Sequence, residues 1–222
     1  MILYHGSSEI IQKPIYGKGK EYNDYGKGFY CTEHMELARE WACTEEQDGY
    51  ANKYEFDLNQ MKILNLFTQK DATLCWLALL TEYREIRLST PVMKQAYQWL
   101  QSNYHLDIQE YDVIIGYRAD DSYFSFARAF LNNTISFGQL SYAMRLGKLG
   151  EQYVLKSEKA FRTIQFVDAI RAEREEYFVK RKSRDDDARE AFFREMNKAD
   201  MEGTYVMDLI RNEVSRDDPR IQ

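Results

Sequence analysis

Two hydrophobic patterns alternate along the chain: short apolar runs, and apolar residues at helical spacing. Apolar runs bounded by glycine or polar residues predict β-strands, here at residues 2–4, 28–32, 54–58, 62–66, 111–117, 151–157 and 163–166. Apolar residues three or four positions apart predict helices, here at residues 33–43, 72–83, 91–100, 121–131 and 137–147. Residues 10–27 are rich in Gly, Lys, Asn and Tyr and predict a loop.

Capping signals support several of these helix starts. Thr90 followed by Pro91 combines a capping hydroxyl with proline at the first helical position. Ser136 and Gln139 have the spacing of a capping box, and Asp71 can cap the apolar segment that follows it.

The pattern changes at about Val167. Beyond it, charged residues of both signs dominate and apolar residues recur sparsely, which predicts helices with narrow apolar faces. The order of strands, helices, strands and a helical tail predicts an α+β fold with a mixed or antiparallel sheet. We therefore expect a domain at residues 1–166 and a charged helical extension at residues 167–222.

Composition argues against several classes of protein. The formal net charge of −6 argues against a broad grip on nucleic-acid phosphates, although it leaves room for a local basic groove. Cys31, Cys43 and Cys75 suggest neither a disulfide framework nor a zinc site, and His34 and His105 lack partners at ligand spacing. No segment has the features of a signal peptide or the roughly 20 apolar residues of a membrane span. We expect a soluble cytoplasmic protein that binds no metal and no membrane.

The first candidate binding residues are two glycines and two aromatic residues. Gly26 and Gly28 flank a lysine just before a predicted strand, where glycine permits positive φ and close approach of a ligand. Tyr30 lies on that strand and Trp41 on the following helix. Their rings can face one crevice and form a slot for a flat cationic ring such as the nicotinamide of NAD⁺. The alternative is that both rings belong to the hydrophobic core.

The tripeptide His5-Gly6-Ser7 follows directly on the first predicted strand. A glycine at a strand end exposes backbone groups that can pair with a carboxamide. The neighbouring imidazole and hydroxyl can bind ribose oxygens. Alone, such a tripeptide is also typical of a simple turn.

Taken in order, LYHGS, GKGFY and a helix bearing an aromatic residue resemble the poly-ADP-ribose-polymerase-like (diphtheria-toxin-type) ADP-ribosyltransferases. These enzymes carry a His–Tyr–Glu triad, and the chain also resembles their bacterial toxin–antitoxin-type branch. The resemblance covers residues 2–42 and implies an ADP-ribosyltransferase-like fold that uses NAD as co-substrate. It implies that His5 binds the ribose, that Gly6 binds the carboxamide, and that Tyr30 and Trp41 stack on the nicotinamide.

Two positions depart from the family pattern. Ala38 falls where the family often has a serine that bonds the carboxamide. The family's late strand begins with the triad glutamate, whereas the matching run here begins at Gln152, with Glu151 one place earlier. Strand alternation favours Gln152 facing the pocket and Tyr153 facing away, but a bulge at Gly150 would turn Glu151 inward instead. A glutamine supplies no negative charge to an oxocarbenium-like ribose, so we expect slow mono-transfer.

Two further segments have open interpretations. Arg118 follows a predicted central strand and can pair with NAD phosphates, or it can be a solvated residue beside a helix capped by Asp121. Residues 180–187 predict a solvated stretch between helices, or a docking patch for a regulatory partner or substrate.

Three functional hypotheses follow. The leading one is a mono-ADP-ribosyltransferase that acts on a protein or nucleic-acid acceptor, with a small antitoxin-like partner bound to its C-terminal helices. The second is a weak or inactive module that binds NAD or ADP-ribose. The third is an interaction protein whose charged tail matters most and whose pocket is vestigial.

Overall fold

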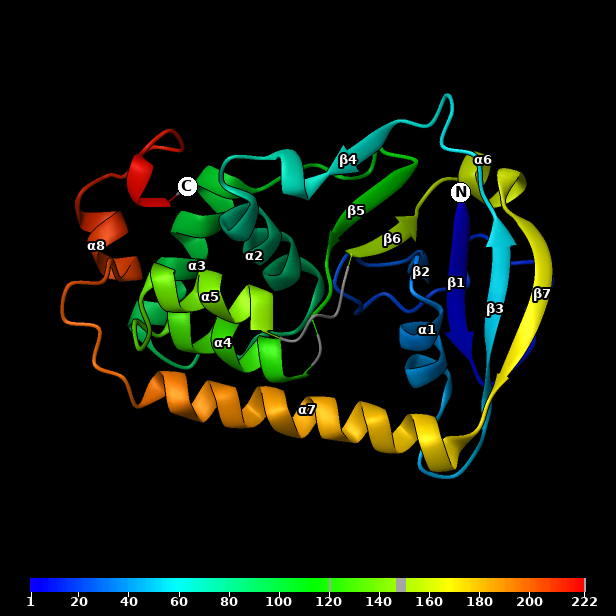
Figure 1. Cartoon of the computed structure of the whole chain (residues 1–222). Helices are drawn as coiled ribbons and strands as arrows, with labels where there is room; N and C mark the ends of the chain where they lie inside the picture. The colour runs from blue at the N-terminus through cyan, green and yellow to red at the C-terminus, as the bar shows by residue number, and fades with distance from the viewer. Residues whose placement is uncertain (120, 147–150, 222) are drawn as a thin grey trace.

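The structure is a computed structural model of the whole chain and describes residues 1–119, 121–146 and 151–221 (Figure 1). The described strands form two sheets. The first is antiparallel, in the order β1-β3-β7, and consists of β1 (Ile2–Ser7), β3 (Gly49–Glu55) and β7 (Gln165–Ala172). The second has the order β2-β6-β5-β4 and consists of β2 (Phe29–Cys31), β4 (Ile63–Asn65), β5 (Val113–Tyr117) and β6 (Glu151–Leu155). It is mixed, because β4 and β5 are parallel.

The helices divide between the two sheets. They are α1 (Met35–Ala42), α2 (Ala72–Tyr83), α3 (Pro91–Tyr104), α4 (Asp121–Leu131), α5 (Phe137–Leu146), α6 (Glu158–Thr163), α7 (Arg174–Met196) and α8 (Val206–Arg211), with short 3₁₀ turns at Leu66–Thr68 and Pro219–Ile221. Figure 1 shows α2 to α5 and α8 gathered on one side of the four-stranded sheet. The long helix α7 runs along the lower edge of the molecule, beneath both α1 and α4 (Figure 1). The predicted α+β class is confirmed.

Alternating residues give the four-stranded sheet two buried faces. Val154 and Ile114 belong to the core shared with the helices, which includes the almost entirely buried helix α2. Tyr153 and Cys31 face the other way and pack with Leu3 of the three-stranded sheet. The two sheets meet at one bridge, in which Tyr4 and Thr32 exchange backbone hydrogen bonds of 2.8 and 2.9 Å.

Two of the three predicted caps are confirmed. Thr90 Oγ1 accepts a hydrogen bond from Met93 N at 3.1 Å. Ser136 and Gln139 form the reciprocal capping box, with distances of 3.1 and 2.9 Å. Asp71 does occupy the position before α2, but its side chain makes no capping bond because it pairs with Arg216 instead. The predicted helix end at residue 147 lies outside the described residues.

The strand predicted at residues 54–58 is present with different bounds, because it runs from Gly49 to Glu55. This central strand contains a buried Asn52, whose amide is satisfied by backbone groups that include Ile11 N (2.9 Å) and Glu9 O (3.1 Å). Because an inward position of this strand holds a polar residue, the hydrophobic pattern of the sequence does not reveal the strand's first half.

The C-terminal pattern also needs correction. Residues 167–172 are strand rather than helix, because they pair with β3, and β7 therefore crosses the predicted domain boundary. Residues 180–187 lie within the single helix α7 and not between helices. The division into two domains stays a prediction. Among the described residues, no helix has both the length and the apolar character needed to cross a membrane.

Candidate functional site

A cavity of about 900 Å³ opens where β1 and β2 diverge, a volume within the range of small-molecule sites. Its lining comes from many parts of the chain. It includes His5, Gly6 and Ser7 of β1, Phe29 and Tyr30 of β2, Trp41 of α1, Gln152 of β6, Arg84, Arg118, Ala119 and most of the loop from Ser8 to Asp24. Of the predicted site residues, Ala38 and Glu151 are not among the described lining residues.

Gly6 lets α1 lie directly against β1. A Cβ at this position would come within 2.2 Å of Ala38 O and 2.8 Å of Trp41 Cβ. The close approach places Trp41 at the cavity and buries Ala38 completely. Ala38 therefore acts through helix packing, which differs from its predicted place among the NAD contacts.

The end of β1 presents an open backbone edge. Tyr4 uses both its N–H and its C=O to bond Thr32. Since backbone groups of a strand alternate between its two sides, those of Gly6 point in the same direction, beyond the end of the bridge. Gly6 lines the cavity there, as a residue that pairs with a carboxamide must.

His5 is held in one tautomer. Its Nδ1 lies 2.7 Å from Tyr30 O, and a carbonyl oxygen can only accept, so Nδ1 carries the proton. Burial lowers the pKa of His5 below its usual 6.5, and the ring stacks on Phe29 with centroids 4.2 Å apart. At neutral pH the imidazole is therefore uncharged, and Nε2 is left as a hydrogen-bond acceptor.

The segment just before β2 holds the Tyr30 side chain in place through hydrogen bonds. The Tyr30 hydroxyl donates to Gly26 O (2.6 Å) and accepts from Tyr25 N (3.1 Å), while burial raises its pKa. Gly26 has φ +70°, a left-handed conformation that favours glycine, so the expected positive φ is confirmed at this position. Lys27 turns away to an exposed ion pair with Glu21. The ring of Tyr30 is thus oriented by its own loop.

Trp41 already stacks on a cation. The Arg118 guanidinium carbon lies 4.0 Å from the centroid of the indole ring, and both residues line the cavity. Arg118 is half-buried at the cavity rather than solvated, and its pairing with NAD phosphates stays a prediction. Tyr30 and Trp41 are both half-buried and line the cavity, and Tyr30 also packs against the helical core, so a role of the two rings in binding NAD stays a prediction.

Gln152 faces the cavity and binds a residue that the sequence analysis missed. Its Nε2 donates to Asp24 Oδ2 (3.1 Å) and to Tyr117 O (2.8 Å). The buried Asp24 also accepts from Ala119 N at 2.8 Å and pairs with Arg84 Nε at 3.1 Å. Burial raises the pKa of Asp24, against the opposing effect of Arg84.

This network sets the direction of the Gln152 amide. Because Asp24 and Tyr117 O take both amide hydrogens, Oε1 is the group left to accept a hydrogen bond. The negative charge nearest the third triad position therefore comes from Asp24 rather than from residue 152. Asp24 lies in the loop, 128 positions from Gln152, and no local sequence pattern links the two.

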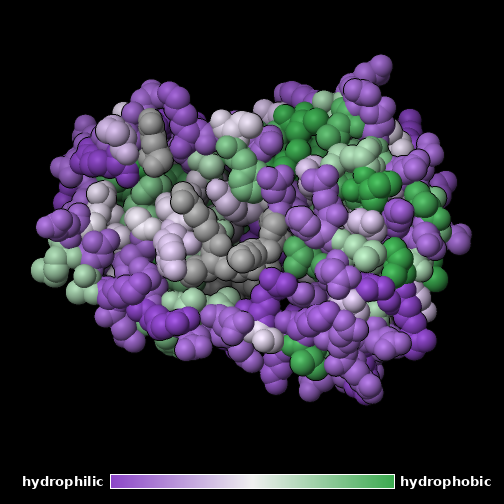
Figure 2. All heavy atoms as spheres, viewed as in Figure 1, coloured by the Kyte–Doolittle hydropathy of each residue, from purple (hydrophilic) through white to green (hydrophobic). Residues whose placement is uncertain are grey.

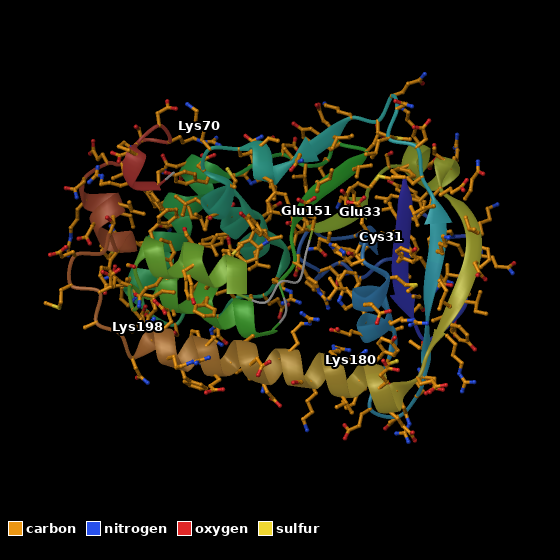
Figure 3. All side chains as sticks on the ribbon, in the orientation of Figure 1. Cys31, Glu33, Lys70, Glu151, Lys180 and Lys198 are labelled. Carbon is orange, nitrogen blue, oxygen red and sulfur yellow. The ribbon has the colours of Figure 1, made fainter. Side chains whose placement is uncertain are left out.

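Glu151 lies on the opposite face of β6. It is exposed, and it shares that face with Tyr153, whose hydroxyl donates to Glu33 Oε2 at 2.8 Å. Figure 3 shows Glu151 and Glu33 in the same region of the molecule. Glu151 is thus wrongly predicted as an alternative inward residue. The bulge expected at Gly150 lies outside the described residues.

The other titratable candidates are separate from the cavity. His34 and His105 are exposed, and all three cysteines are free and buried. Burial raises the pKa of Cys31, which faces the core between the sheets. Among the described residues, no three His, Cys, Asp or Glu side chains are grouped so as to hold a metal ion.

Fold and cavity together define an α+β protein with a ligand-sized site between two sheets. A family model described as "Protein of unknown function (DUF3990)" matches residues 1–166, and the chain belongs to this family. The match covers about three quarters of the chain and ends within β7. No curated protein and no solved structure matches the chain.

Proposed function

We propose that the protein is an NAD-dependent mono-ADP-ribosyltransferase with an ADP-ribosyltransferase-like split sheet. One observation carries the proposal: His5, Tyr30, Trp41 and Gln152, from four separate elements, line one cavity. Each of them matches a motif position of the family that the sequence resembles. Between the described parts of the two sheets there is one isolated bridge, which is consistent with a cleft that admits a dinucleotide.

The nicotinamide lies between Tyr30 and Trp41 in this proposal. Its carboxamide pairs with the open backbone groups of Gly6, as a peptide pairs with a strand edge. Trp41 already stacks on a planar cation, so its surroundings suit the positively charged nicotinamide ring. On binding, nicotinamide replaces the Arg118 guanidinium, which moves to the diphosphate.

The loop beside β1 provides the opposite wall. Lys13, Lys18 and Lys20 line the cavity and are exposed, so they supply positive charge to the diphosphate and the adenosine half. They give the dinucleotide a direction, with nicotinamide at Gly6 and adenosine toward the loop.

The ribose is held by two acceptors. His5 Nε2 and Gln152 Oε1 each accept a hydrogen bond from a ribose hydroxyl. As the C1′–nitrogen bond breaks, its electron pair leaves on nicotinamide, and a nucleophilic atom of the acceptor bonds to C1′ and releases its proton. Asp24 polarises the Gln152 amide from behind but is itself paired with Arg84, so charge stabilisation is weaker than with a direct carboxylate. Slow transfer of a single ADP-ribose is the expected outcome.

The biological setting follows from the same resemblance. We place the protein in the cytoplasm, in keeping with three free cysteines, as the toxin of a toxin–antitoxin pair. A small antitoxin-like protein would bind the exposed side of the C-terminal helices α7 and α8. The acceptor is a macromolecule or one of its building blocks.

Incubation with labelled NAD tests the proposal. The wild-type chain should release nicotinamide and bind NAD in calorimetry, and His5→Ala should lose both. His34→Ala is the matched control, because it removes an exposed histidine outside the cavity and should change neither. Absence of both binding and nicotinamide release in the wild type would refute the proposal.

A second candidate is a module that binds NAD without cleaving it. The neutral Gln152, hydrogen-bonded to Asp24, favours this function. It predicts NAD binding that depends on His5 and Trp41, with no nicotinamide release under any condition. The same two measurements therefore separate the enzyme from the module.

A further inference from the structure

A second cavity, of about 520 Å³, adjoins the first. Trp41, Arg84, Arg118 and Ala119 line both cavities, so the stacked pair of Trp41 and Arg118 stands between them. The far wall of the second cavity is α7, which runs beneath α1 in Figure 1. A molecule bound there lies next to Trp41, on which the nicotinamide is proposed to stack.

The second cavity is basic although the chain is acidic. Its described lining has six cationic and four acidic side chains, whereas the whole chain has a formal charge of −6. Two of the four acids are already paired. Glu40 is buried and accepts both hydrogen bonds of a bidentate pair from Arg184 (2.8 and 2.9 Å), and Asp185 pairs with Arg189 at 2.6 Å. These pairs also engage two of the six cations, and Arg84 pairs with Asp24 at 3.1 Å, so a phosphate in this cavity would depend mainly on Arg181 and Lys182.

Helix α7 presents cations and an aromatic ring on the same wall. Arg181 and Lys182 are exposed, and Arg181 gives one hydrogen bond to Cys43 O at 3.3 Å. Phe178, one turn earlier, is half-buried and also lines the cavity. Figure 2 shows that hydrophilic residues cover most of the lower edge of the molecule, where α7 lies. Exposed cations beside an aromatic ring suit a phosphate joined to a flat base.

From these observations we infer that the second cavity binds the acceptor, and that the acceptor is a phosphate-bearing nucleotide, either free or within a single strand. The volume admits a nucleotide, a phosphate would pair with Arg181 and Lys182, and a base would stack near Phe178. This inference rests on the proposed function for the transfer itself. In the transfer, a nucleophilic atom of the nucleotide bonds to C1′ as the C1′–nitrogen bond breaks and nicotinamide leaves with the electron pair.

The binding test needs no NAD. Fluorescence anisotropy of the full chain with a labelled single-stranded oligothymidylate should show binding that weakens as salt increases. In Arg181→Glu/Lys182→Glu, affinity should fall about tenfold or more, and the salt slope should decrease by about one for each lost phosphate contact. Lys94→Glu is the matched control, because it reverses an exposed charge on α3 outside both cavities and should bind like the wild type.

Competition experiments then identify the ligand. Competition by free AMP indicates that one nucleotide fills the site, whereas binding that only an oligonucleotide competes for indicates a strand; both support the inference. No binding, equal binding by the double variant, or competition only by a phosphopeptide overturns it. Nicotinamide release without oligonucleotide should be unchanged in the double variant, so a failure of NAD cleavage in the wild type would be a separate failure, that of the proposed function.

Discussion

The helical core and the cavity both gather aromatic residues, but they hold them in opposite ways. In the core, Trp76 and Tyr104 are completely buried, and neither Trp76 Nε1 nor Tyr104 Oη has a hydrogen-bond partner within the described part of the chain. At the cavity, the Tyr30 hydroxyl makes two hydrogen bonds, and His5 is fixed by a backbone carbonyl. Trp76 and Tyr104 are thus held by packing, whereas Tyr30 and His5 are held by directed polar contacts.

This difference separates stability from function. A ring held by packing contributes through the apolar area that it buries, and its removal leaves a void. A ring oriented by hydrogen bonds at an open cavity buries less area but has a defined direction. Substitutions in the core should therefore affect unfolding, and substitutions at the cavity should affect NAD.

The largest effect is expected for Trp76→Ala. Truncation of this fully buried ring should lower the free energy of unfolding by about 3–5 kcal/mol. Urea denaturation followed by circular dichroism measures the change. A loss well below this range would mean that the helical core is not packed as described.

Trp41→Ala should show the reverse behaviour. The ring is half-buried, so we expect a loss of stability of about 1 kcal/mol or less, together with a fall in NAD affinity of about tenfold. Denaturation and calorimetry on the same sample give both values. A large loss of stability with unchanged NAD affinity would place Trp41 with the core rings instead.

Gln152→Glu tests the polar network. A carboxylate at this position would face Asp24 and Tyr117 O, so stability at neutral pH should fall by about 1–3 kcal/mol, with no gain in NAD cleavage. Adding Asp24→Asn should recover part of the loss, which a double-mutant cycle measures. Glu151→Gln, on the opposite face of β6, is the matched control and should leave both properties unchanged.

The smallest effect concerns pH. Burial lowers the pKa of His5 below 6.5, so NAD affinity should be constant from neutral pH down to about 6.5 and should fall below it, as Nε2 gains a proton. The unfolded chain binds more protons at His5 in this window, so stability should also fall as the pH decreases. Calorimetry of His5→Gln across the same pH range should show no such change in whatever NAD binding remains. Asp24 is still present in this variant, and burial raises its pKa above the usual 3.8, so the variant separates the effect of His5 from that of Asp24. A step that persists in this variant would assign it to another group.

Local signals in the sequence were sufficient for much of the fold. Helices α2 and α4 have the predicted bounds, and the caps at Thr90 and Ser136 are present, because each depends on residues a few positions apart. The bounds of β3 and β7 were missed because strand pairing between distant segments determines them.

The residues of the candidate site also fall into those that the sequence predicts and those that only the fold brings together. His5, Tyr30 and Gln152 were found because strand alternation and motif spacing place them. Asp24 was missed because its partners Ala119 and Gln152 are about a hundred positions away in sequence, and only the fold brings them together. The second cavity was missed for the same reason, since residues 180–187 gain a partner surface only when α7 lies against α1.

The most direct test of the central claim is a crystal structure of the protein soaked with NAD. We expect the nicotinamide ring between Tyr30 and Trp41, its carboxamide on the backbone of Gly6, and a ribose hydroxyl within hydrogen-bond distance of His5 Nε2. An empty cavity at saturating NAD, or NAD bound at another place on the chain, would contradict it.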